Sequence, residues 1–323
     1  MMSEKKVTFA VFADLHAEIM HDGLKRLEKI LQVSRDANVD FVIHCGDFCY
    51  PLGADVCRCP EERRPVNVHN AHKRLKAEDA RAVLETYKSF EKPTYHVSGN
   101  HEFDFASVED IVKVYGMPAA YYSFHVNGWH FIVLDNNYIK TPDGRYEHYD
   151  HAHYFYQDLP YLPPEELAWL ENELTKTDEP AVIFSHAPLF EYAYCVKNHY
   201  EVAEIIKRAK ARGKKVRMCI NGHVHVDDLD EIDGVLYYNC NSASNMWIDR
   251  FSGKRYCDKI EEKYPNLRYV IPFQKATYAI VTLDKDGVSV QGMTGRYVQP
   301  GPKKVGWKTR ISPSVKSWSK KWK

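Results

Sequence analysis

Residues 7–16 read VTFAVFADLH, and this stretch indicates how the chain folds. The apolar run from Val7 to Ala13 has the length of a buried strand, and the polar residues Asp14 and His16 follow it directly. The run is too short to cross a membrane, and no small-residue cleavage pattern follows it, so we do not expect a signal peptide. We therefore expect a buried strand whose carboxyl end carries side chains capable of chemistry.

The same arrangement recurs after four later apolar runs. Polar ligand-type residues at the carboxyl ends of strands are where an open α/β sheet places its active site. Gly46, Gly99 and Gly222 lie among these residues and allow the backbone to turn sharply there. The segments that follow the five strands are Asp14-Leu15-His16, Cys45-Gly46-Asp47, Ser98-Gly99-Asn100-His101-Glu102, His186, and Asn221-Gly222-His223-Val224-His225.

Short apolar runs alternate with amphipathic helical patterns along the chain, which predicts an α/β architecture. We expect one domain over residues 1–296, followed by a basic, tryptophan-containing C-terminal tail over residues 297–323. The predicted strands span residues 7–13, 40–44, 94–97, 121–125, 130–135, 181–185, 216–220, 229–232, 235–239, 278–283 and 288–292. The predicted helices span residues 23–37, 70–90, 108–114, 163–174 and 201–211.

The polar residues at the strand ends form a set of metal ligands. They offer carboxylate, amide and imidazole groups and no thiolate, a combination that suits Mn, Fe and Zn. Seven such residues are too many for one tetrahedral ion, but they suit two ions that share a carboxylate. The seven are Asp14, His16, Asp47, Asn100, His186, His223 and His225.

The ordered motifs DxH, GD, GNHE, H and GHxH between Asp14 and His225 resemble those of the calcineurin-like metallophosphoesterase superfamily. The resemblance implies a four-layer αββα sandwich of two mixed β-sheets flanked by helices. It also implies that Asp14, His16 and His225 hold one metal ion and that Asn100, His186 and His223 hold the other. Asp47 would bridge the two ions, and His101 would face the substrate phosphate.

The resemblance implies a hydrolase that cleaves a small phosphodiester or nucleotide-like substrate by attack of a hydroxide bound between two divalent ions. We expect Mn or Fe first, with Zn as a third candidate. His101 would protonate the leaving oxygen or stabilise charge there. For Glu102 two interpretations stay open: it orients a ligand or His101, or it is a solvent-facing acid of the loop.

Departures from subfamily patterns narrow the choice toward the bacterial phosphodiesterase type. The Asp-Arg-Gly motif of serine/threonine protein phosphatases is absent after Asp47. Tyr50 matches the tyrosine of purple acid phosphatases, but those enzymes have glycine where this chain has His16, so we interpret Tyr50 as a packing or pocket residue. The alternatives are a phosphomonoesterase and, behind it, a non-catalytic scaffold that has kept the fold. Loss of ligands would mark the scaffold, and here all seven are present.

Substrate contacts should come from outside the motifs. The stretch from Tyr138 to Pro164 is rich in aromatic residues, so it is either a lid that stacks on a nucleobase or a loop packed on itself. We take Asn100, His101, Tyr50 and Tyr192 as substrate-binding candidates. Asn241, Ser242 and Asn245, at the end of a later strand, are further candidates for the pocket lining.

Charge is balanced overall, with 44 basic and 44 acidic residues, which disfavours a nucleic-acid partner. The last 37 residues, after Asp286, carry nine basic residues and no acidic one, with Trp307, Trp318 and Trp322 interleaved. Such a segment suits either a surface strap pinned to the acidic body or a contact with nucleic acid or lipid, and we favour the strap.

Cysteine usage and the lack of a recognisable export signal indicate the cellular compartment that we expect. With eight cysteines and no export signal, we expect reduced thiols and a cytoplasmic protein with no membrane partner. Cys57 and Cys59 lack the usual spacing of a zinc site, so we do not expect one there. The sequence carries no signal for the oligomeric state.

Overall fold

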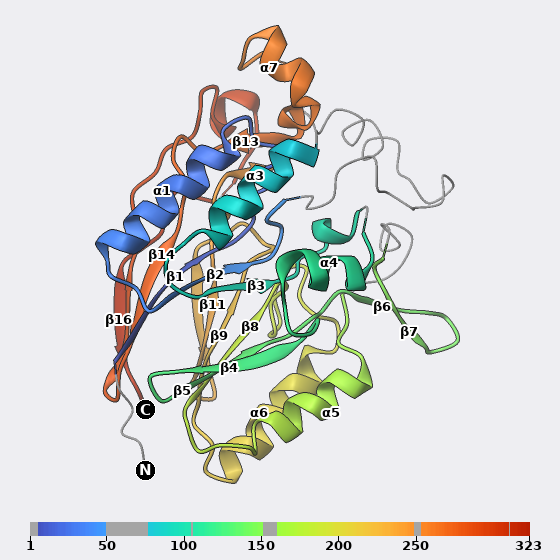
Figure 1. Cartoon of the computed structure of the whole chain (residues 1–323), viewed down its shortest axis with the longest axis vertical. Helices are drawn as coiled ribbons and strands as arrows, with labels where there is room; N and C mark the ends of the chain where they lie inside the picture. Colours follow the sequence, from blue (N-terminus) through green and yellow to red (C-terminus); the bar gives the residue numbers. More distant parts are fainter. Residues whose placement is uncertain (1–5, 50–76, 105, 151–159, 249–252, 310) are drawn as a thin grey trace.

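Two six-stranded β-sheets pack face to face at the centre of the computed structural model, and helices cover their outer faces (Figure 1). The structure describes residues 6–49, 77–104, 106–150, 160–248, 253–309 and 311–323. Helices α1 (Gly23–Asp36) and α3 (Ala77–Lys88) lie along the first sheet, and α5 (Pro164–Glu173) and α6 (His199–Ala211) lie along the second. The predicted four-layer αββα sandwich of two mixed sheets is therefore confirmed.

The first sheet joins both ends of the chain. Its strands β1, β2 and β3 are parallel to one another, and the remaining three continue from β1 in antiparallel pairs. In spatial order the strands are β16 (Trp318–Lys321), β15 (Gly287–Gln291), β14 (Ala279–Leu283), β1 (Val7–Phe12), β2 (Phe41–Cys45) and β3 (Thr94–Val97).

The second sheet has four parallel strands at its centre and an antiparallel strand at each edge. Asn127 and Gly128 both have positive φ values, 53° and 79°, as a two-residue turn between β4 and β5 requires. In spatial order the strands are β10 (Asp228–Ile232), β11 (Val235–Asn239), β9 (Val216–Asn221), β8 (Ala181–Ser185), β5 (Trp129–Val133) and β4 (Tyr122–Val126).

Aromatic side chains fill the space between the sheets. Phe9 and Phe41 of the first sheet meet Phe131 of the second edge to face, with ring centroids 5.8 and 4.9 Å apart. A separate apolar cluster, including Leu170 and Ile205, lies between the second sheet and its two helices. Burial of apolar surface on both faces explains why the central strands read as continuous apolar runs.

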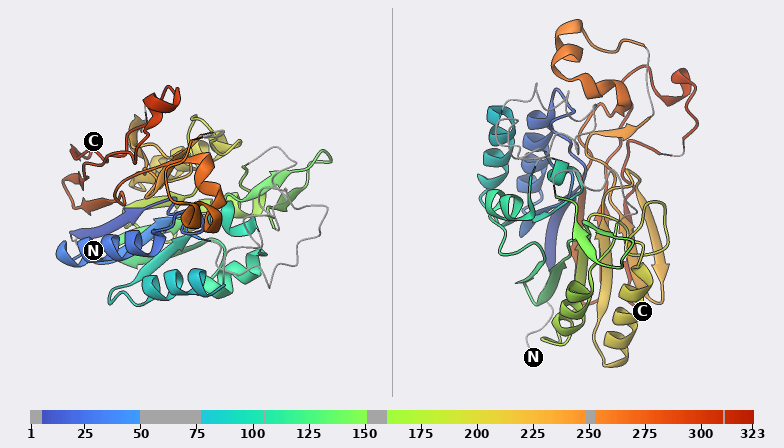
Figure 2. Two further views of the ribbon diagram at one scale, coloured as in Figure 1. Left: turned by 90° about the horizontal axis from the view of Figure 1, so that it is seen from above. Right: turned by 90° about the vertical axis from the view of Figure 1, so that its right-hand side faces the viewer.

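Shorter elements surround the sandwich. Helix α4 (Val108–Tyr115) begins at a capping box in which Ser107 and Asp110 bond reciprocally. Helix α7 lies at the end of the molecule that also holds β13 (Figures 1 and 2). The remaining elements are the 3₁₀ turns η3 (His101–Asp104), η5 (Pro265–Tyr269) and η6 (Pro302–Val305), the pair β6 (Tyr138–Lys140) and β7 (Tyr146–His148), the pair β12 (Asn245–Trp247) and β13 (Val270–Pro272), and α7 (Asp258–Lys263).

The last described residues are part of the first sheet. Strand β16 pairs with β15, and Trp318 and Trp322 pack against the main core, as the strap interpretation predicted. The domain boundary at residue 296 stays a prediction. None of the helices in the described part of the chain is long and apolar enough to cross a membrane.

Candidate metal centre

The ligand-type residues predicted from the strand ends converge on one place. Two groups of three buried or half-buried side chains each bring their donor atoms within 4.8 Å of one another. In both groups the ligands come from both sheets, because β1, β2 and β3 lie in the first sheet and β8 and β9 in the second. The groups are Asp14, His16 and His225, and Asp47, His186 and His223.

The backbone at these residues is unusual. Nine non-glycine residues of the described chain have positive φ, and five of them are candidate ligands, each directly after a central strand. For such residues a left-handed conformation costs of order 1–3 kcal/mol and persists where the surrounding structure imposes it, typically at functional sites. The five are Asp14, His16, Asp47, His223 and His225, with φ between 45° and 70°.

Gly46 and Gly99 are required by the close approach of the ligands. A Cβ atom added to Gly46 would lie 2.3 Å from Nδ1 of His186, and one added to Gly99 would lie 2.3 Å from Oδ1 of Asp47. Gly46 also has φ of +89°, which favours glycine on its own. The glycines of the sequence motifs therefore make room for the ligands as well as for the turns.

Hydrogen bonds orient three of the imidazole rings. Nδ1 of His186 lies 2.8 Å from the carbonyl of Cys45, and Nδ1 of His225 lies 2.8 Å from that of Asn245. Nδ1 of His16 lies 3.0 Å from Oε1 of Glu18. In each ring Nε2 is then the nitrogen directed at the cluster. Metal-binding histidines are commonly oriented in this way, by a hydrogen bond at the ring nitrogen that does not bind the metal.

The donor set fits metal ions. Nε2 of His16 is buried and has no hydrogen-bond partner among the described residues. Nδ1 of His223 lies 3.1 Å from Nε2 of His186. A buried, unpartnered ring nitrogen is costly unless a cation or a proton satisfies it. Oxygen and imidazole donors in this arrangement suit borderline divalent ions.

Asp47 belongs to the second group and also faces His16 of the first. Its Oδ2 is 3.3 Å from Nε2 of His186 and 3.7 Å from Nε2 of His16, which belong to different groups. The Oδ1 atom of Asn100 lies 3.2 Å from Nε2 of His186. The predicted assignment of Asn100 to the group of His186, and of Asp47 to a bridge, is compatible with these distances.

Opposite charges shift the pKa values within the cluster. Burial would raise the pKa of Asp47, but His186 and His101 hold it well below its usual range. Burial would lower the pKa of His186, and Asp47 outweighs it and raises the pKa to about 9. Burial together with the neighbouring His186 lowers the pKa of His223 to about 3. Without bound metal, the site therefore pairs a charged Asp47 with a protonated His186 and leaves His223 uncharged.

His101 is fixed beside the bridge position. Its backbone N–H donates to Oδ1 of Asp47 at 2.9 Å, and its Nδ1 lies 2.9 Å from Oδ2 of Asp104. Burial would lower the pKa of His101, but Asp104 and Asp47 raise it to about 10. The ring thus has a fixed orientation and, before metal binding, a proton to donate.

Glu102 is buried and orients the ligand loops, so it is not a solvent-facing acid. Its carboxylate accepts hydrogen bonds from the backbone N–H groups of Asp47, Phe48 and Gly99 at 2.6–3.0 Å. The hydroxyl of Tyr115 donates to the same carboxylate at 3.0 Å. Burial, together with Asp47, raises the pKa of Glu102 to about 7. The first of the two interpretations of Glu102 is confirmed.

Trp247 and Tyr194 flank the cluster, and Trp247 was not identified from the sequence. The Trp247 ring is stacked with that of His101 at 5.9 Å and meets that of His16 edge to face at 5.4 Å. The ring centroids of Tyr194 and His223 lie 6.2 Å apart in an edge-to-face arrangement. The backbone of Tyr194 has a positive φ of 56°. Both rings are exposed, by 37% and 77%, so each offers a free aromatic face beside the ligands.

The other predicted pocket residues lie in several places. The hydroxyl of Tyr192 donates to Asp228 at 2.9 Å, and its ring packs against Phe190. Tyr50, Cys57 and Cys59 lie outside the described residues. Ser242 donates to the backbone carbonyl of Asp14, so it supports the ligand loop. The backbone carbonyl of Asn245 forms a hydrogen bond with Nδ1 of His225 and so supports that ligand. The side-chain amide of Asn241 instead donates to the carbonyl of Ser312.

The aromatic stretch from residue 138 to 164 is partly described. Strands β6 and β7 form a hairpin, and Tyr149 behind it is 1% exposed. His148 lies between Asp135 and Asp150, with nitrogen–oxygen distances of 3.0 and 2.5 Å. Ile139 and Tyr149 belong to the main buried core. Residues 151–159 lie outside the described part, so the lid and the loop packed on itself both stay predictions.

The αββα sandwich with two histidine–carboxylate groups at its strand ends defines a metal-binding α/β protein. The family model of the calcineurin-like phosphoesterases matches residues 7–227, a segment that holds all seven candidate ligands. The chain belongs to the calcineurin-like phosphoesterase family, and it is therefore a phosphoric ester hydrolase by family.

Solved structures show the same fold. A dimetal phosphatase from Danio rerio is 17% identical, with a TM-score of 0.60 over 90% of this chain and 98% of that one. GAP50, the anchor in the inner membrane complex of Plasmodium, is 14% identical, with a TM-score of 0.50 over 95% of this chain and 89% of that one. No curated protein matches the chain at a significant level.

Proposed function

We propose that this protein is a metal-dependent phosphodiesterase that hydrolyses a small phosphodiester or nucleotide-like substrate with two divalent ions. The observation that carries the proposal is the pair of adjacent ligand groups, in which one carboxylate oxygen of Asp47 faces both His186 and His16. Two ions held about 3.5–4 Å apart are suited to in-line displacement at phosphorus. Asp14, His16 and His225 would hold one ion, Asn100, His186 and His223 the other, and Asp47 both.

The metal ions, when bound, lower the pKa of a water molecule and neutralise charge on the phosphoryl oxygens. We propose Mn or Fe, with Zn as the alternative, because the donors are nitrogen and oxygen only. The protein contributes rigidity: hydrogen bonds to Cys45, Glu18 and Asn245 fix three rings before any ion arrives. Glu102 fixes the loop that carries Asp47.

His101 supplies the proton for the leaving group. Asp104 holds Nδ1 of the ring, so we assign Nε2 to the leaving oxygen. The backbone bond from His101 to Asp47 keeps this ring next to the bridge position. A histidine held in this way can protonate an alkoxide as it departs, which matters most for poor leaving groups.

Two features favour a diester with an aromatic or nucleoside group over a monoester. Trp247 and Tyr194 present exposed aromatic faces on either side of the ligands, where a ring attached to the phosphate would stack. Arg145, the one arginine of the stretch from 138 to 164, is 69% exposed and paired with Asp143 and Glu147, so it does not stand ready for a phosphate dianion.

A substrate panel run with several metals tests the proposal. Protein stripped with a chelator and reloaded with Mn, Fe or Zn is assayed on matched aryl and nucleoside diesters and monoesters. We expect the nucleoside diester to exceed the matching monoester in kcat/KM by more than about tenfold, or about 1.4 kcal/mol. A monoester preference of that size would establish the phosphomonoesterase instead. Full metal occupancy with no turnover of any ester would establish the scaffold. The cytoplasmic location and the lack of a nucleic-acid partner stay predictions.

A further inference from the structure

The basic segment after Asp286 divides into two parts with different surroundings. Near its end, Lys320 and Lys323 both pair with Glu231, at 2.8 and 2.6 Å. Earlier in the segment, the ammonium groups of Lys303, Lys304 and Lys308 form no ion pair or hydrogen bond with any residue that the structure describes. The interpretation of this segment as a surface strap accounts for the part with Lys320 and Lys323. It does not account for the part with Lys303, Lys304 and Lys308.

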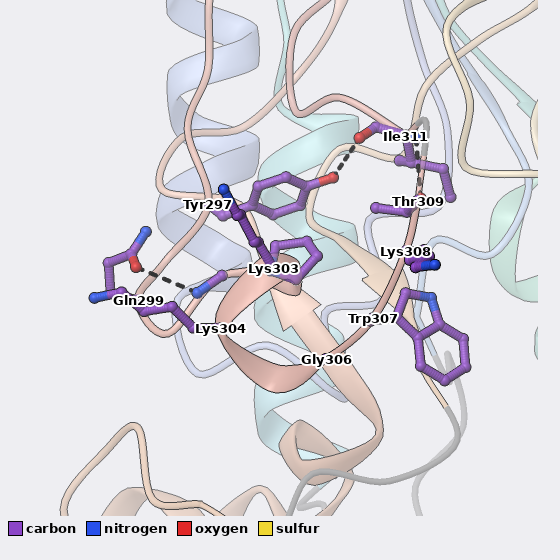
Figure 3. Close-up of a pocket in the computed structure, with 11 residues that line it drawn as sticks. Tyr297, Gln299, Lys303, Lys304, Gly306, Trp307, Lys308, Thr309 and Ile311 are labelled. Atoms are coloured by element: carbon purple, nitrogen blue, oxygen red, sulfur yellow. Dashed lines mark hydrogen bonds between the residues drawn. The ribbon is translucent and has the colours of Figure 1, made fainter.

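The three unpaired lysines line one cavity. Figure 3 shows them around η6, together with Tyr297 and Trp307. The cavity has a volume of about 840 Å³, and none of its lining residues is acidic. Trp307 is 36% exposed, one of five large apolar side chains exposed to this degree in the described chain. The cavity thus combines unneutralised positive charge with an open aromatic face.

The walls of this cavity are held by packing and hydrogen bonds. The hydroxyl of Tyr297 donates to the carbonyl of Ile311 at 2.6 Å, and the Tyr297 ring meets Phe273 edge to face at 5.6 Å. Tyr297 and Ile311 pack on a buried cluster that includes Met246 and Phe273. The backbone N–H of Trp307 donates to the carbonyl of Pro302 at 3.0 Å, which closes the turn. The site is therefore built into the fold.

We propose that this cavity is a second ligand site, which binds a small phosphorylated compound with a planar aromatic ring, such as a nucleoside monophosphate. The ring lies against the exposed Trp307, and the lysines bind the phosphate. The volume lies within the range of small-molecule pockets. A strand of nucleic acid would need a basic groove that tracks its backbone, and here the lysines surround one cavity. None of the candidate metal ligands lines it, and it lies beyond the family match at 227.

Binding of AMP to the full-length chain tests this proposal. Titration calorimetry is run on protein freed of metal by a chelator, with adenosine and inorganic phosphate as the two partial probes. We expect AMP to bind at least about tenfold more tightly than either part, because charge and stacking act together. Equal affinity for AMP and phosphate would overturn the aromatic half of the proposal, and equal affinity for AMP and adenosine would overturn the phosphate half.

Variants assign the binding to the cavity. Lys303→Gln/Lys304→Gln should weaken AMP binding by about tenfold or more. Trp307→Leu should weaken AMP and adenosine but leave phosphate unchanged. The matched control, Lys316→Gln/Lys321→Gln, removes the same charge from exposed positions of the same segment outside the cavity and should leave affinity unchanged. Circular dichroism of each variant verifies the fold, and Trp307→Met replaces Trp307→Leu if the latter unfolds.

Three results would overturn the proposal. One is an equal loss of affinity in the lysine control, which would indicate a general charge effect. Another is loss of AMP binding in His223→Ala, which would place the bound nucleotide at the metal centre. The last is binding of a single-stranded oligonucleotide where AMP does not bind, which would make the surface a nucleic-acid contact. Because the titration uses metal-free protein and no turnover, its result is independent of the proposed phosphodiesterase activity.

Discussion

Asp47 is the residue on which the metal centre depends most. One carboxylate oxygen of Asp47 faces His16 and His186, and the other accepts a hydrogen bond from the backbone N–H of His101. The backbone N–H of Asp47 donates to the carboxylate of Glu102. The side chain therefore connects both ligand groups with the candidate proton donor, at a backbone φ of 52°.

We predict that Asp47→Asn removes metal and activity together. Asparagine keeps the shape of the side chain but removes the one negative charge that faces both groups, so affinity for both ions should fall by more than about a hundredfold. Metal content after dialysis and kcat on a diester measure the two effects. Asp104→Asn, which leaves the ligand set intact, is the control and should retain its metal. Full metal occupancy in Asp47→Asn would contradict the bridging role.

His101→Ala should separate chemistry from metal binding. Its side chain is not among the seven ligands, so the variant should keep its metal while kcat falls by roughly 10²- to 10⁴-fold. The loss should be smallest for substrates with acidic leaving groups, which depart without a proton. A plot of log kcat against leaving-group pKa is the measurement. An equal loss for all leaving groups, or loss of metal, would show that His101 has another role.

At the scale of elements, β16 and Trp322, which follows it directly, show how the last described residues contribute to the fold. Trp322 donates from Nε1 to the carbonyl of Asp284 at 2.8 Å, and the guanidinium of Arg217 lies 5.1 Å above its ring. We predict that Trp322→Ala lowers the free energy of unfolding by about 2 kcal/mol, because the ring is half-buried. Trp307→Ala, at an exposed ring in the same segment, should change it by less than about 0.5 kcal/mol. Urea unfolding curves give both values, and equal effects would contradict the packed role of β16.

The β6–β7 hairpin should make stability depend on pH. Burial would lower the pKa of His148, but Asp135 and Asp150 raise it to about 9. The folded pKa is thus above the value of about 6.5 in the unfolded chain. The contribution of protonated His148 to the free energy of unfolding is complete below about pH 6.5 and is lost as pH rises through about 9. The shift corresponds to a contribution of about 3 kcal/mol to the free energy of unfolding.

His148→Gln tests this dependence. With metal kept saturating, the difference in unfolding free energy between wild type and variant should shrink from pH 6 to pH 9.5. Denaturant titrations at four pH values measure it. His125→Gln provides a comparison at a half-exposed ring on β4, where the difference should stay small. A constant difference between wild type and His148→Gln over this range would rule out the assigned charge pair.

Elements with a strong pattern were predicted from the sequence, and short ones were not. Strands β1, β2, β3, β8 and β9 are largely apolar runs of four to six residues, so their ends, and with them the ligands, could be predicted. Strands β6, β7, β12 and β13 have three residues each, too few for a period to show. Trp247 was missed for this reason: it lies on β12, and its approach to His101 depends on the pairing with β13.

At the scale of the whole molecule, the metal centre joins the two sheets. Asp14, His16 and Asp47 come from the first sheet, and His186, His223 and His225 come from the second. Each group contains ligands from both. A bound ion therefore links the sheets at the ends of their strands, beyond the aromatic core that holds their faces together.

Removal of metal should accordingly destabilise the entire sandwich. A ligand that binds only the folded state stabilises it by about 2.7 kcal/mol at a concentration one hundred times its dissociation constant. We expect Tm to fall on treatment with a chelator and to recover on addition of excess Mn. Asp47→Asn should show neither change. If the wild-type Tm is the same with and without metal while the metal is shown to bind, the two sheets do not depend on the ions.

The distribution of ligands along the chain also sets a time at which the protein can acquire its ions during synthesis. The first group is incomplete until residue 225 has left the ribosome, and the second until residue 223 has done so. The first sheet is incomplete until β14, β15 and β16 follow, because β1 pairs with β14. A nascent chain that stalls before residue 223 therefore displays Asp14, His16 and Asp47 without the histidines that complete either site. Metal loading belongs to the last third of translation or to the finished chain.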